Sequence, residues 1–576
     1  MLKDIYDPLT EYVNVFRDKF KDVAKRTFEK LASEAQVDIE ANRETCRQIY
    51  QAESNLLSVK KSITWWTVGC VLLWVVVVAG IVVAFTTDIV YLVEWMVALC
   101  AGEVLVLVFL FFKVHPRLKE LKTERGRLSD LIKSLKREAW AQMAPLNRLY
   151  DWDILTRMMS QTVPKLEFDP YFTTQRLADL KMSYGWSDSF NEGRSVIYSH
   201  SGLIAGNPFV ICRTRKMVMG TKTYTGTKTI HWTTRERGSD GKYHTVHHSE
   251  TLTACVTAPY PEYPEKTRLI YGNVAAPDLI FTRRQSGLAI KGGSLSYKLS
   301  LKRLRKKARN LTGADFAMMT NEEFETVFNT SDRNNNQQYA LLFTPLAQES
   351  MMKLLQDQSV GYGDDFDFGK LKKINIIVSN HMQGLDLEMN PQQYHRFDYD
   401  KAEEDFCKIN ADYFRAIYFC MAPLLCVPLY QQMRPQHDIY GHDMEHRSAF
   451  WEHEALANFW GQDHFKHPEC VTNCILKTEQ RMLGGGSSAL TVYAYGYRVK
   501  KRLTYIRKWG GDGRAHNVPV YWDEYLPVVG NGEIQLKEDN HIESPSTTHR
   551  QRLDHINDVL SKSNLKIYRR HIASKV

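Results

Sequence analysis

The residue types best suited to binding a metal ion lie close together in the C-terminal region. They are His437, His442, Glu445, His446, His453, His464, His467, Cys470 and Cys474. Two imidazoles and two thiols are the ligand set of many tetrahedral zinc sites. The sequence therefore offers a zinc site built from His464, His467, Cys470 and Cys474. Because the paired Cys-x-x-Cys signature is missing, a His-rich segment that binds no metal is the alternative.

The acidic residue Glu103 lies near the middle of an apolar run long enough to span a membrane. A charge at that depth costs on the order of 3 kcal/mol, so the carboxyl group must be protonated, hydrated or paired. The neighbouring apolar run has no basic residue, and pairing would need another subunit. Glu103 is a candidate for an ion or proton pathway, and the alternative is a protonated carboxyl group hydrogen-bonded within a helix bundle.

A dense basic run lies between residues 302 and 309. Its six cations are Lys302, Arg303, Arg305, Lys306, Lys307 and Arg309. Leu299, Leu304 and Leu311 would share one face of a helix through this run, as in amphipathic helices that bind membrane surfaces. Each cation near an anionic bilayer contributes about 1 kcal/mol to binding. We expect contact with anionic lipid, with a solvated charge run as the alternative and nucleic acid as the less favoured partner.

Common catalytic motifs are missing from the sequence. It has no G-x-x-x-x-G-K-S/T phosphate loop, no H-E-x-x-H helix and no G-x-S-x-G elbow. Their absence argues against the most common ATPases, zinc proteases and serine hydrolases. The net charge of +9 suits anionic lipid, but nucleic acid or an acidic partner would fit equally well.

Two apolar runs within residues 62–112 indicate an integral membrane protein. Each exceeds the roughly 20 residues that span about 30 Å of hydrocarbon, and only Thr86, Thr87 and Asp88 separate them. Basic residues precede the first run and follow the second, whereas the turn between the runs has none. Both termini are therefore expected in the cytoplasm. The ten cysteines would then lie in the cytosol or the bilayer and stay reduced.

Helical segments are predicted on both sides of this transmembrane hairpin. In residues 1–61, Phe16, Phe20 and Phe28 recur near a helical period, and no Gly or Pro occurs from Leu9 onward. This pattern predicts a long amphipathic helix. Residues 113–146 show the leucine spacing of a short coiled coil. The two helices could pair as a stalk within one chain or associate with neighbouring subunits.

The rest of the chain is predicted to be an α+β cytoplasmic domain of antiparallel sheet with packed helices. Residues 147–300 form a β-rich half with an antiparallel meander, and residues 301–430 form an α+β half. In that second half QYALLFT is predicted as a strand between two helices, and INIIVS and LDLEM as a strand pair. Residues 431–576 form a His-rich extension, with GGGSS at 484–488 as a flexible joint.

The C-terminal extension repeats a motif of the meander. Arg235, Gly238, Asp240, Gly241, His244 and Val246 recur at identical spacing as Arg507, Gly510, Asp512, Gly513, His516 and Val518. The repeat indicates a duplicated β-hairpin. A Gly-x-Asp-Gly turn chosen independently for its backbone conformation is the alternative.

Five segments carry a family resemblance: SHSGLI, RERGSDGKYHTV, EEFETVFNTSD, YALLFTPLAQESMMKLL and KKINIIVSNHMQGLDLEM. They resemble an uncharacterised bacterial membrane-protein family, a domain-of-unknown-function group often encoded near LemA-type proteins. The resemblance covers roughly residues 150–420. It implies a cytoplasmic α+β domain tethered by a membrane hairpin, a bacterial setting and a LemA-type protein as a candidate partner. It implies no reaction.

These observations predict a multi-pass protein of the bacterial inner membrane, associated as a homo-oligomer through its spans and stalk. Its cytoplasmic domain would bind a partner or organise a membrane assembly, and nothing in the sequence requires catalysis. One alternative is a membrane-tethered metal-dependent enzyme that uses zinc at the His/Cys cluster. The other is an ion or proton pathway around Glu103.

Overall fold

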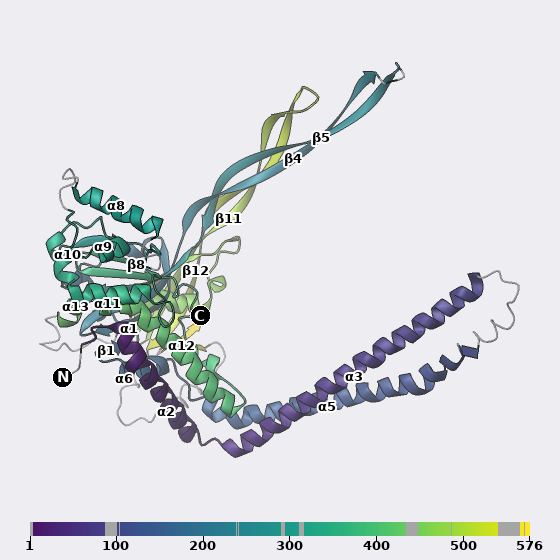
Figure 1. Ribbon diagram of the computed structural model, residues 1–576, viewed down its shortest axis with the longest axis horizontal. Coiled ribbons are helices and arrows are strands. Elements are labelled where there is room, and N and C mark those ends of the chain that lie inside the picture. The colour runs from purple at the N-terminus through teal and green to yellow at the C-terminus, as the bar shows by residue number, and fades with distance from the viewer. Residues whose placement is uncertain are drawn as a thin grey trace. The chain divides into compact units, whose positions relative to one another are not determined.

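The computed structural model divides into two compact units, shown together in Figure 1. It describes residues 4–86, 101–102, 104–106, 108–237, 239, 241–289, 294–309, 316–433, 447–484, 487–538, 565–569 and 571–575. The helical unit comprises Lys25–Tyr150 and Pro391–Lys408. The sheet unit comprises Met1–Ala24, Asp151–Asn390 and Ile409–Val576.

The N-terminal amphipathic segment is helical, but its helix is interrupted. Its elements are α1 (Pro8–Glu11), the π-helix η1 (Tyr12–Phe16), α2 (Arg17–Ala35) and α3 (Ile39–Thr86). Gln36 takes a left-handed backbone conformation with φ of 54°. Asp38 then caps the next helix, because its carboxylate accepts a hydrogen bond from the Ala41 amide at 3.0 Å. The prediction of one continuous helix is therefore wrong at this break.

Two long helices, α3 and α5 (His115–Asn147), lie side by side in the helical unit, and the π-helix η2 (Leu110–Val114) precedes α5 (Figure 1). Gln142 links them, since it accepts from the Asn42 amide at 3.1 Å and donates to Thr45 Oγ1 at 3.0 Å. Of the two arrangements left open by the sequence, the structure shows pairing within one chain. The short 3-10 helix η4 (Pro391–Tyr394) also belongs to this unit.

One described helix is long and apolar enough to cross a membrane. This is α3, over Ile39–Val75, whose most apolar window is not buried against the rest of the protein. The predicted transmembrane hairpin also needs residues 87–100, 103 and 107, which lie outside the described part of the chain. The structure therefore supports one candidate span by length and composition.

The described residues of the sheet unit form three antiparallel sheets. The seven-stranded sheet has the order β1-β2-β3-β6-β9-β8-β7, the five-stranded sheet β10-β11-β12-β14-β13, and β4 and β5 form a separate hairpin. The strands are β1 (Leu166–Phe168), β2 (Arg194–Ile204), β3 (Asn207–Lys216), β4 (Val218–Arg237), β5 (Tyr243–Glu262), β6 (Glu265–Gly272), β7 (Ile280–Arg283), β8 (Phe366–Leu371), β9 (Ile374–Ser379), β10 (Ile475–Gly484), β11 (Ser487–Trp509), β12 (Ala515–Glu538), β13 (Leu565–Tyr568) and β14 (His571–Lys575). The predicted α+β class with antiparallel sheet is confirmed.

Besides α1, η1 and the start of α2, the sheet unit contains helices that precede β1 or lie between strands. They are α6 (Ile154–Thr162), α7 (Thr174–Tyr184), the 3-10 helix η3 (Asp188–Asn191), α8 (Leu295–Arg309), α9 (Glu322–Phe328), α10 (Asn336–Leu342), α11 (Pro345–Gln356), α12 (Tyr399–Leu425), α13 (Pro428–Gln432), α15 (Phe450–Trp460) and the 3-10 helix η5 (Gln462–His464). α12 begins in the helical unit and continues into the sheet unit.

Residues before and after position 431 share one hydrophobic core. Val196 of β2, Trp451 of α15 and Leu490 of β11 belong to the same buried cluster. α15 contacts both β2 and β10, so it connects the seven-stranded sheet with the five-stranded one. The C-terminal residues thus complete a core that the preceding residues also build.

The sequence repeat forms the ends of two long hairpins that lie against each other (Figure 1). Pairing has the same register in both, with Arg235 opposite Thr245 in β4–β5 and Arg507 opposite Asn517 in β11–β12. A small apolar cluster joins the two hairpins, and it consists of Ile230, Leu252, Ala254, Val518 and Val520. The predicted meander is therefore split, because β2 and β3 belong to the seven-stranded sheet and β4 and β5 to this hairpin pair.

Three local predictions are wrong. The first five residues of QYALLFT lie in helix α10, where Tyr339 and Leu342 are buried at helical spacing and Asn335 caps the helix. INIIVS is strand β9, but it pairs with β8 and β6, and LDLEM forms no strand. GGGSS spans the connection of a hairpin, since Gly484 pairs with Ser487, and is not a joint between domains.

Candidate functional site

Three short helices in the sheet unit surround a groove, and a polar cap begins each of them. The Asn321 side chain accepts from the Phe324 amide at 3.1 Å to start α9, and Asn335 accepts from Gln338 at 3.0 Å to start α10. Thr344 accepts from the Ala347 amide at 3.4 Å, and Pro345 occupies the first turn of α11. Such caps satisfy backbone donors that a helix start leaves free.

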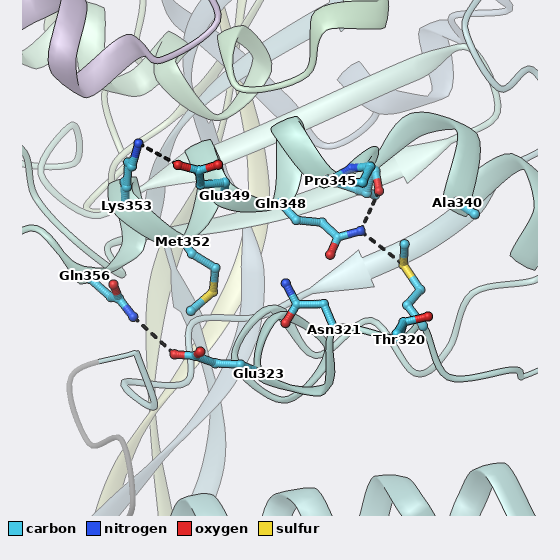
Figure 2. A pocket seen from close by; sticks show the side chains of 12 residues that line it. Thr320, Asn321, Glu323, Ala340, Pro345, Gln348, Glu349, Met352, Lys353 and Gln356 are labelled. Atoms are coloured by element: carbon cyan, nitrogen blue, oxygen red, sulfur yellow. Dashed lines mark hydrogen bonds and ion pairs between the residues drawn. The ribbon is translucent and has the colours of Figure 1, made fainter.

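The groove has a volume of about 770 Å³, within the range of ligand-binding pockets (Figure 2). Its apolar lining consists of Met319, Ala340, Phe343, Pro345 and Met352. Its polar lining consists of Thr320, Asn321, Glu323, Gln348, Glu349, Lys353 and Gln356. Methionine side chains adapt to varied apolar surfaces, so this lining suits an irregular apolar ligand.

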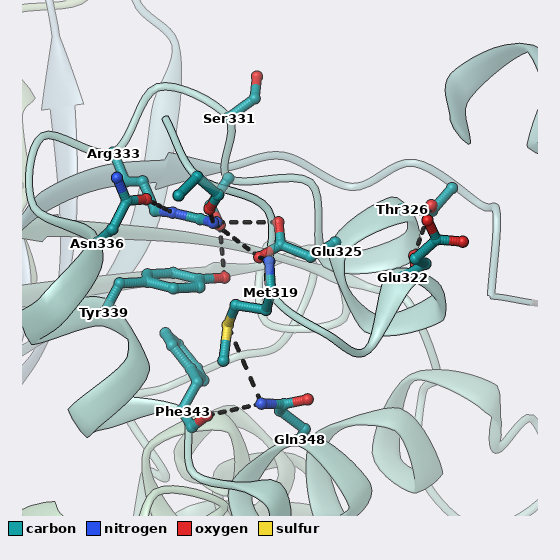
Figure 3. Close-up of polar contacts among 12 residues, drawn as sticks. Met319, Glu322, Glu325, Thr326, Ser331, Arg333, Asn336, Tyr339, Phe343 and Gln348 are labelled. Carbon is teal, nitrogen blue, oxygen red and sulfur yellow. Dashed lines mark hydrogen bonds and ion pairs between the residues drawn. The ribbon is translucent and has the colours of Figure 1, made fainter. Parts of the chain in front are cut away.

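A buried ion pair holds one side of the groove in place (Figure 3). Arg333 and Glu325 have no solvent-exposed side-chain surface, and their closest nitrogen and oxygen atoms lie 2.8 Å apart. The same Glu325 oxygen accepts from the Met319 amide at 3.1 Å, and the guanidinium lies 4.0 Å from the Tyr339 ring centroid. The pair therefore fixes the segment that carries Met319 against α9 and α10.

The charged side chains at the groove differ in whether they have an oppositely charged partner. Lys353 bonds Glu349 and also Asp7, and these two hydrogen bonds raise the pKa of the lysine amine. At Glu323 the recorded contact is the neutral Gln356 amide, at 3.4 Å, within the described residues. The groove thus presents an uncompensated carboxylate beside an apolar floor, which favours a ligand that carries both a cation and apolar groups.

Comparisons of the chain with protein-family models, curated proteins and solved structures gave no match. The resemblance to the LemA-associated bacterial family stays a prediction. The chemistry of the groove is inferred from its own lining residues.

The predicted basic run lies on α8, but its six cations are not equivalent. Arg305 forms two hydrogen bonds with Glu322 of α9, and Lys307 donates to the Ser331 carbonyl. The remaining four are exposed and belong to no recorded ion pair within the described residues: Lys302, Arg303, Lys306 and Arg309. Leu295 and Leu299 are also exposed on this helix, at 80% and 55%. α8 therefore presents a cationic face with apolar side chains.

The predicted zinc ligands are only partly brought together. Cys470 and Cys474 lie side by side with their sulfur atoms 3.6 Å apart, while His467 accepts a hydrogen bond from the Glu469 amide. Among the described residues no group of three or more His, Cys, Asp or Glu side chains is arranged to hold a metal ion. The structure therefore supports a pair of thiols here, without the two imidazoles of the predicted site.

Other members of the His-rich segment have different positions. His453 is buried on α15 and lies 2.9 Å from the Ser448 hydroxyl, and burial lowers the pKa of its imidazole to about 4. It is a neutral core residue at physiological pH. His437, His442, Glu445 and His446 lie outside the described residues, as does Glu103.

Sequence reasoning missed the groove, although one local signal was present. Pro345 and Met352 fall in the helix predicted after QYALLFT, but they line the groove only because α9 and α10 pack beside that helix. Met352 and Glu349, three residues apart on one face of a predicted helix, are the sequence feature that could have identified it.

Proposed function

We propose that this chain is a membrane-anchored binding protein whose sheet unit captures a cationic, apolar segment of a partner in the groove. The observation that carries the proposal is the groove itself: about 770 Å³, with Met319, Phe343 and Met352 at an apolar lining and Glu323 beside them. No catalytic step is part of the proposal. A scaffold role fits the same site, because a pre-formed groove can hold partners without altering them.

The anchor we propose is the hairpin of residues 62–112, with both termini and the sheet unit in the cytoplasm of a bacterium. Its support is the length of the two apolar runs and the basic residues that flank them. The candidate span in α3 and the pairing of α3 with α5 agree with this arrangement. We further propose that the spans and the paired helices associate in a homo-oligomer, and that a LemA-type membrane protein is one partner.

Blocking the groove should weaken binding of a suitable peptide. Ala340 is exposed at the groove, so Ala340→Trp would fill it without disturbing the core. The probe is a synthetic peptide with leucines and lysines at helical spacing, measured by fluorescence anisotropy. Loss of one desolvated apolar anchor costs on the order of 2 kcal/mol, and we expect at least about a tenfold weaker Kd.

The matched control is Leu341→Trp, because Leu341 is 59% exposed and does not line the groove. It should leave the Kd unchanged, and Glu323→Lys should weaken it. Equal binding by Ala340→Trp and the parent chain, or equal binding of a leucine–glutamate peptide, would show that the groove is not the binding site.

The exposed face of α8 should bind anionic lipid. Lys302→Glu, Arg303→Glu and Lys306→Glu together reverse three cations of this face. Each cation contributes about 1 kcal/mol to binding an anionic surface. The affinity of α8 for anionic lipid should therefore fall at least about a hundredfold. The full chain in nanodiscs should show slower amide exchange over α8 with anionic lipid than with neutral lipid, and the triple variant should lose this difference.

A variant with the same change in net charge provides the control. Lys228→Glu, Lys500→Glu and Lys508→Glu reverse exposed lysines on the two long hairpins. This variant should keep the lipid-dependent protection of α8. If α8 exchanges equally fast in both lipids in the parent chain, the lipid role is ruled out.

A further inference from the structure

Two free thiols lie in contact in the loop between η5 and β10. The sulfur atoms of Cys470 and Cys474 are 3.6 Å apart. Cys470 is partly exposed, whereas Cys474 is buried. A disulfide bond is about 2.05 Å long, so the two sulfurs would have to move about 1.5 Å closer to form one.

Hydrogen bonds hold the backbone on both sides of each sulfur. The Cys470 amide donates to the His467 carbonyl at 2.8 Å, and the Cys474 amide donates to the Gln462 side chain at 2.9 Å. Between them, Val471 donates to the Tyr497 carbonyl at 2.9 Å, and the Thr472 hydroxyl accepts from the Tyr497 amide at 3.0 Å. The two thiols are thus placed together by the loop and strand β11, not by a chance approach of mobile side chains.

Glycines of the sheet leave room for this loop. A Cβ atom at Gly496 of β11 would lie 2.4 Å from the Cys470 sulfur and 2.8 Å from the Cys474 sulfur. A Cβ at Gly530 of β12 would lie 2.2 Å from the Phe465 carbonyl oxygen and 2.3 Å from the His467 nitrogen. Any side chain at Gly496 would push into the thiol pair, so a glycine here directly serves the contact between the two sulfurs.

We propose that Cys470 and Cys474 form a reversible disulfide by exchange with a small disulfide of the glutathione class. Cys470, the accessible thiol, loses its proton to water and attacks one sulfur of the small disulfide, which releases one small thiol. Cys474 then loses its proton to water, and its thiolate attacks the sulfur of Cys470 and displaces the second small thiol. Each departing small thiolate takes up a proton from water. The two protein thiols are oxidised by two electrons, and the small disulfide is reduced to two thiols.

This chemistry fits a reducing compartment, where protein disulfides are typically transient and report redox state. A disulfide also fits this pair of thiols better than a zinc site does. Zinc needs four ligands, and among the described residues no third His, Cys, Asp or Glu joins the pair. The inference is independent of the proposed function of the groove.

The test uses the purified full chain in glutathione buffers of increasing oxidation, followed by alkylation, trypsin digestion and mass spectrometry. Lys466 and Lys477 flank both cysteines, so residues 467–477 form one tryptic peptide. We expect the oxidised peptide to carry no alkyl group and to weigh two hydrogen atoms less than the unalkylated dithiol peptide. Reduction before alkylation should restore the form with two alkyl groups. Cys474→Ser should instead trap Cys470 as a mixed disulfide with glutathione, and Cys470→Ser should prevent both products.

Two further variants test the geometry. Gly496→Ala should lower the disulfide fraction at least tenfold. Gly369→Ala on β8 should not, since a Cβ there would lie 4.0 Å from the Ile376 carbonyl oxygen. Cys255, exposed on β5, provides an internal reference for a thiol that can form only a mixed disulfide. The proposal would be overturned if Cys470 and Cys474 both stay free under conditions that modify Cys255. It would also be overturned if the chain binds stoichiometric zinc that is lost in Cys470→Ser or Cys474→Ser.

Discussion

Lys370→Met is expected to raise the free energy of unfolding at neutral pH by on the order of 4 kcal/mol. Lys370 lies on β8 with 2% of its surface exposed, and its amine has no hydrogen-bond partner within the described residues. Its recorded contact is the face of the Tyr430 ring, 5.6 Å from the amine. Burial lowers the pKa of this amine from 10.5 to about 7.

This substitution should also change the pH dependence of stability. Between about pH 7 and the unfolded-state pKa of about 10.4, the unfolded chain binds a proton that the folded chain has lost. Stability of the parent chain should therefore rise with pH across this window, because folding must release this proton and the free-energy cost of releasing it falls as the pH rises. Below about pH 7 both states are protonated and the penalty is complete. Methionine cannot titrate, so the variant should lose this contribution.

Urea unfolding of the full chain in detergent, followed by tryptophan fluorescence at pH 6.5 and pH 9.5, measures both effects. The gain from Lys370→Met should be large at the lower pH and smaller at the higher one. The control is Lys372→Met, since Lys372 is exposed two residues further along the chain. An unchanged stability at pH 6.5 would mean that water reaches the Lys370 amine in the folded protein.

Arg333→Met should have a large effect in the opposite direction. Removing the guanidinium leaves the Glu325 carboxylate buried without its partner. We expect the free energy of unfolding to fall by roughly 3–5 kcal/mol. The segment that carries Met319 is held by the same carboxylate, so peptide binding in the groove should fall as well. Urea unfolding and the anisotropy assay measure these two losses.

The chain contains a matched pair for comparison. Arg305 also makes two hydrogen bonds to a glutamate of α9, Glu322, but this pair is on the surface. Surface ion pairs contribute little, so Arg305→Met should change stability only slightly. A second control, Arg333→Met with Glu325→Leu, removes both charges and should recover much of the loss. Equal effects of Arg333→Met and Arg305→Met would show that the buried pair has no special role.

Features that depend on local periodicity were predictable from the sequence, and those that depend on distant partners were not. The repeat of Gly-x-Asp-Gly turns correctly indicated two like hairpins, because a turn and its register are encoded within a few residues. Arg283 of β7 pairs with Asp364 in the core, but neither residue carries a local signal of this contact. QYALLFT was misassigned because a short apolar run suits a strand or a buried helix equally well.

The candidate site shows the same division. Local charge density revealed α8, yet two of its six cations turned out to be bound by neighbouring residues, Glu322 and Ser331. Spacing in the His/Cys segment brought two thiols together but not the imidazoles. The groove combines residues from three helices whose individual types are ordinary, so only their packing reveals it.

The two paired hairpins, β4–β5 and β11–β12, are unusually long. Twenty residues in each strand of β4–β5 correspond to about 65 Å at the usual rise per residue, more than the diameter of many small domains. A lone two-stranded ribbon of that length would bend and twist freely in solution. The apolar cluster shared with β11–β12 braces one ribbon against the other, and a doubled ribbon resists bending. The two ribbons together are therefore expected to bend less than either ribbon would alone.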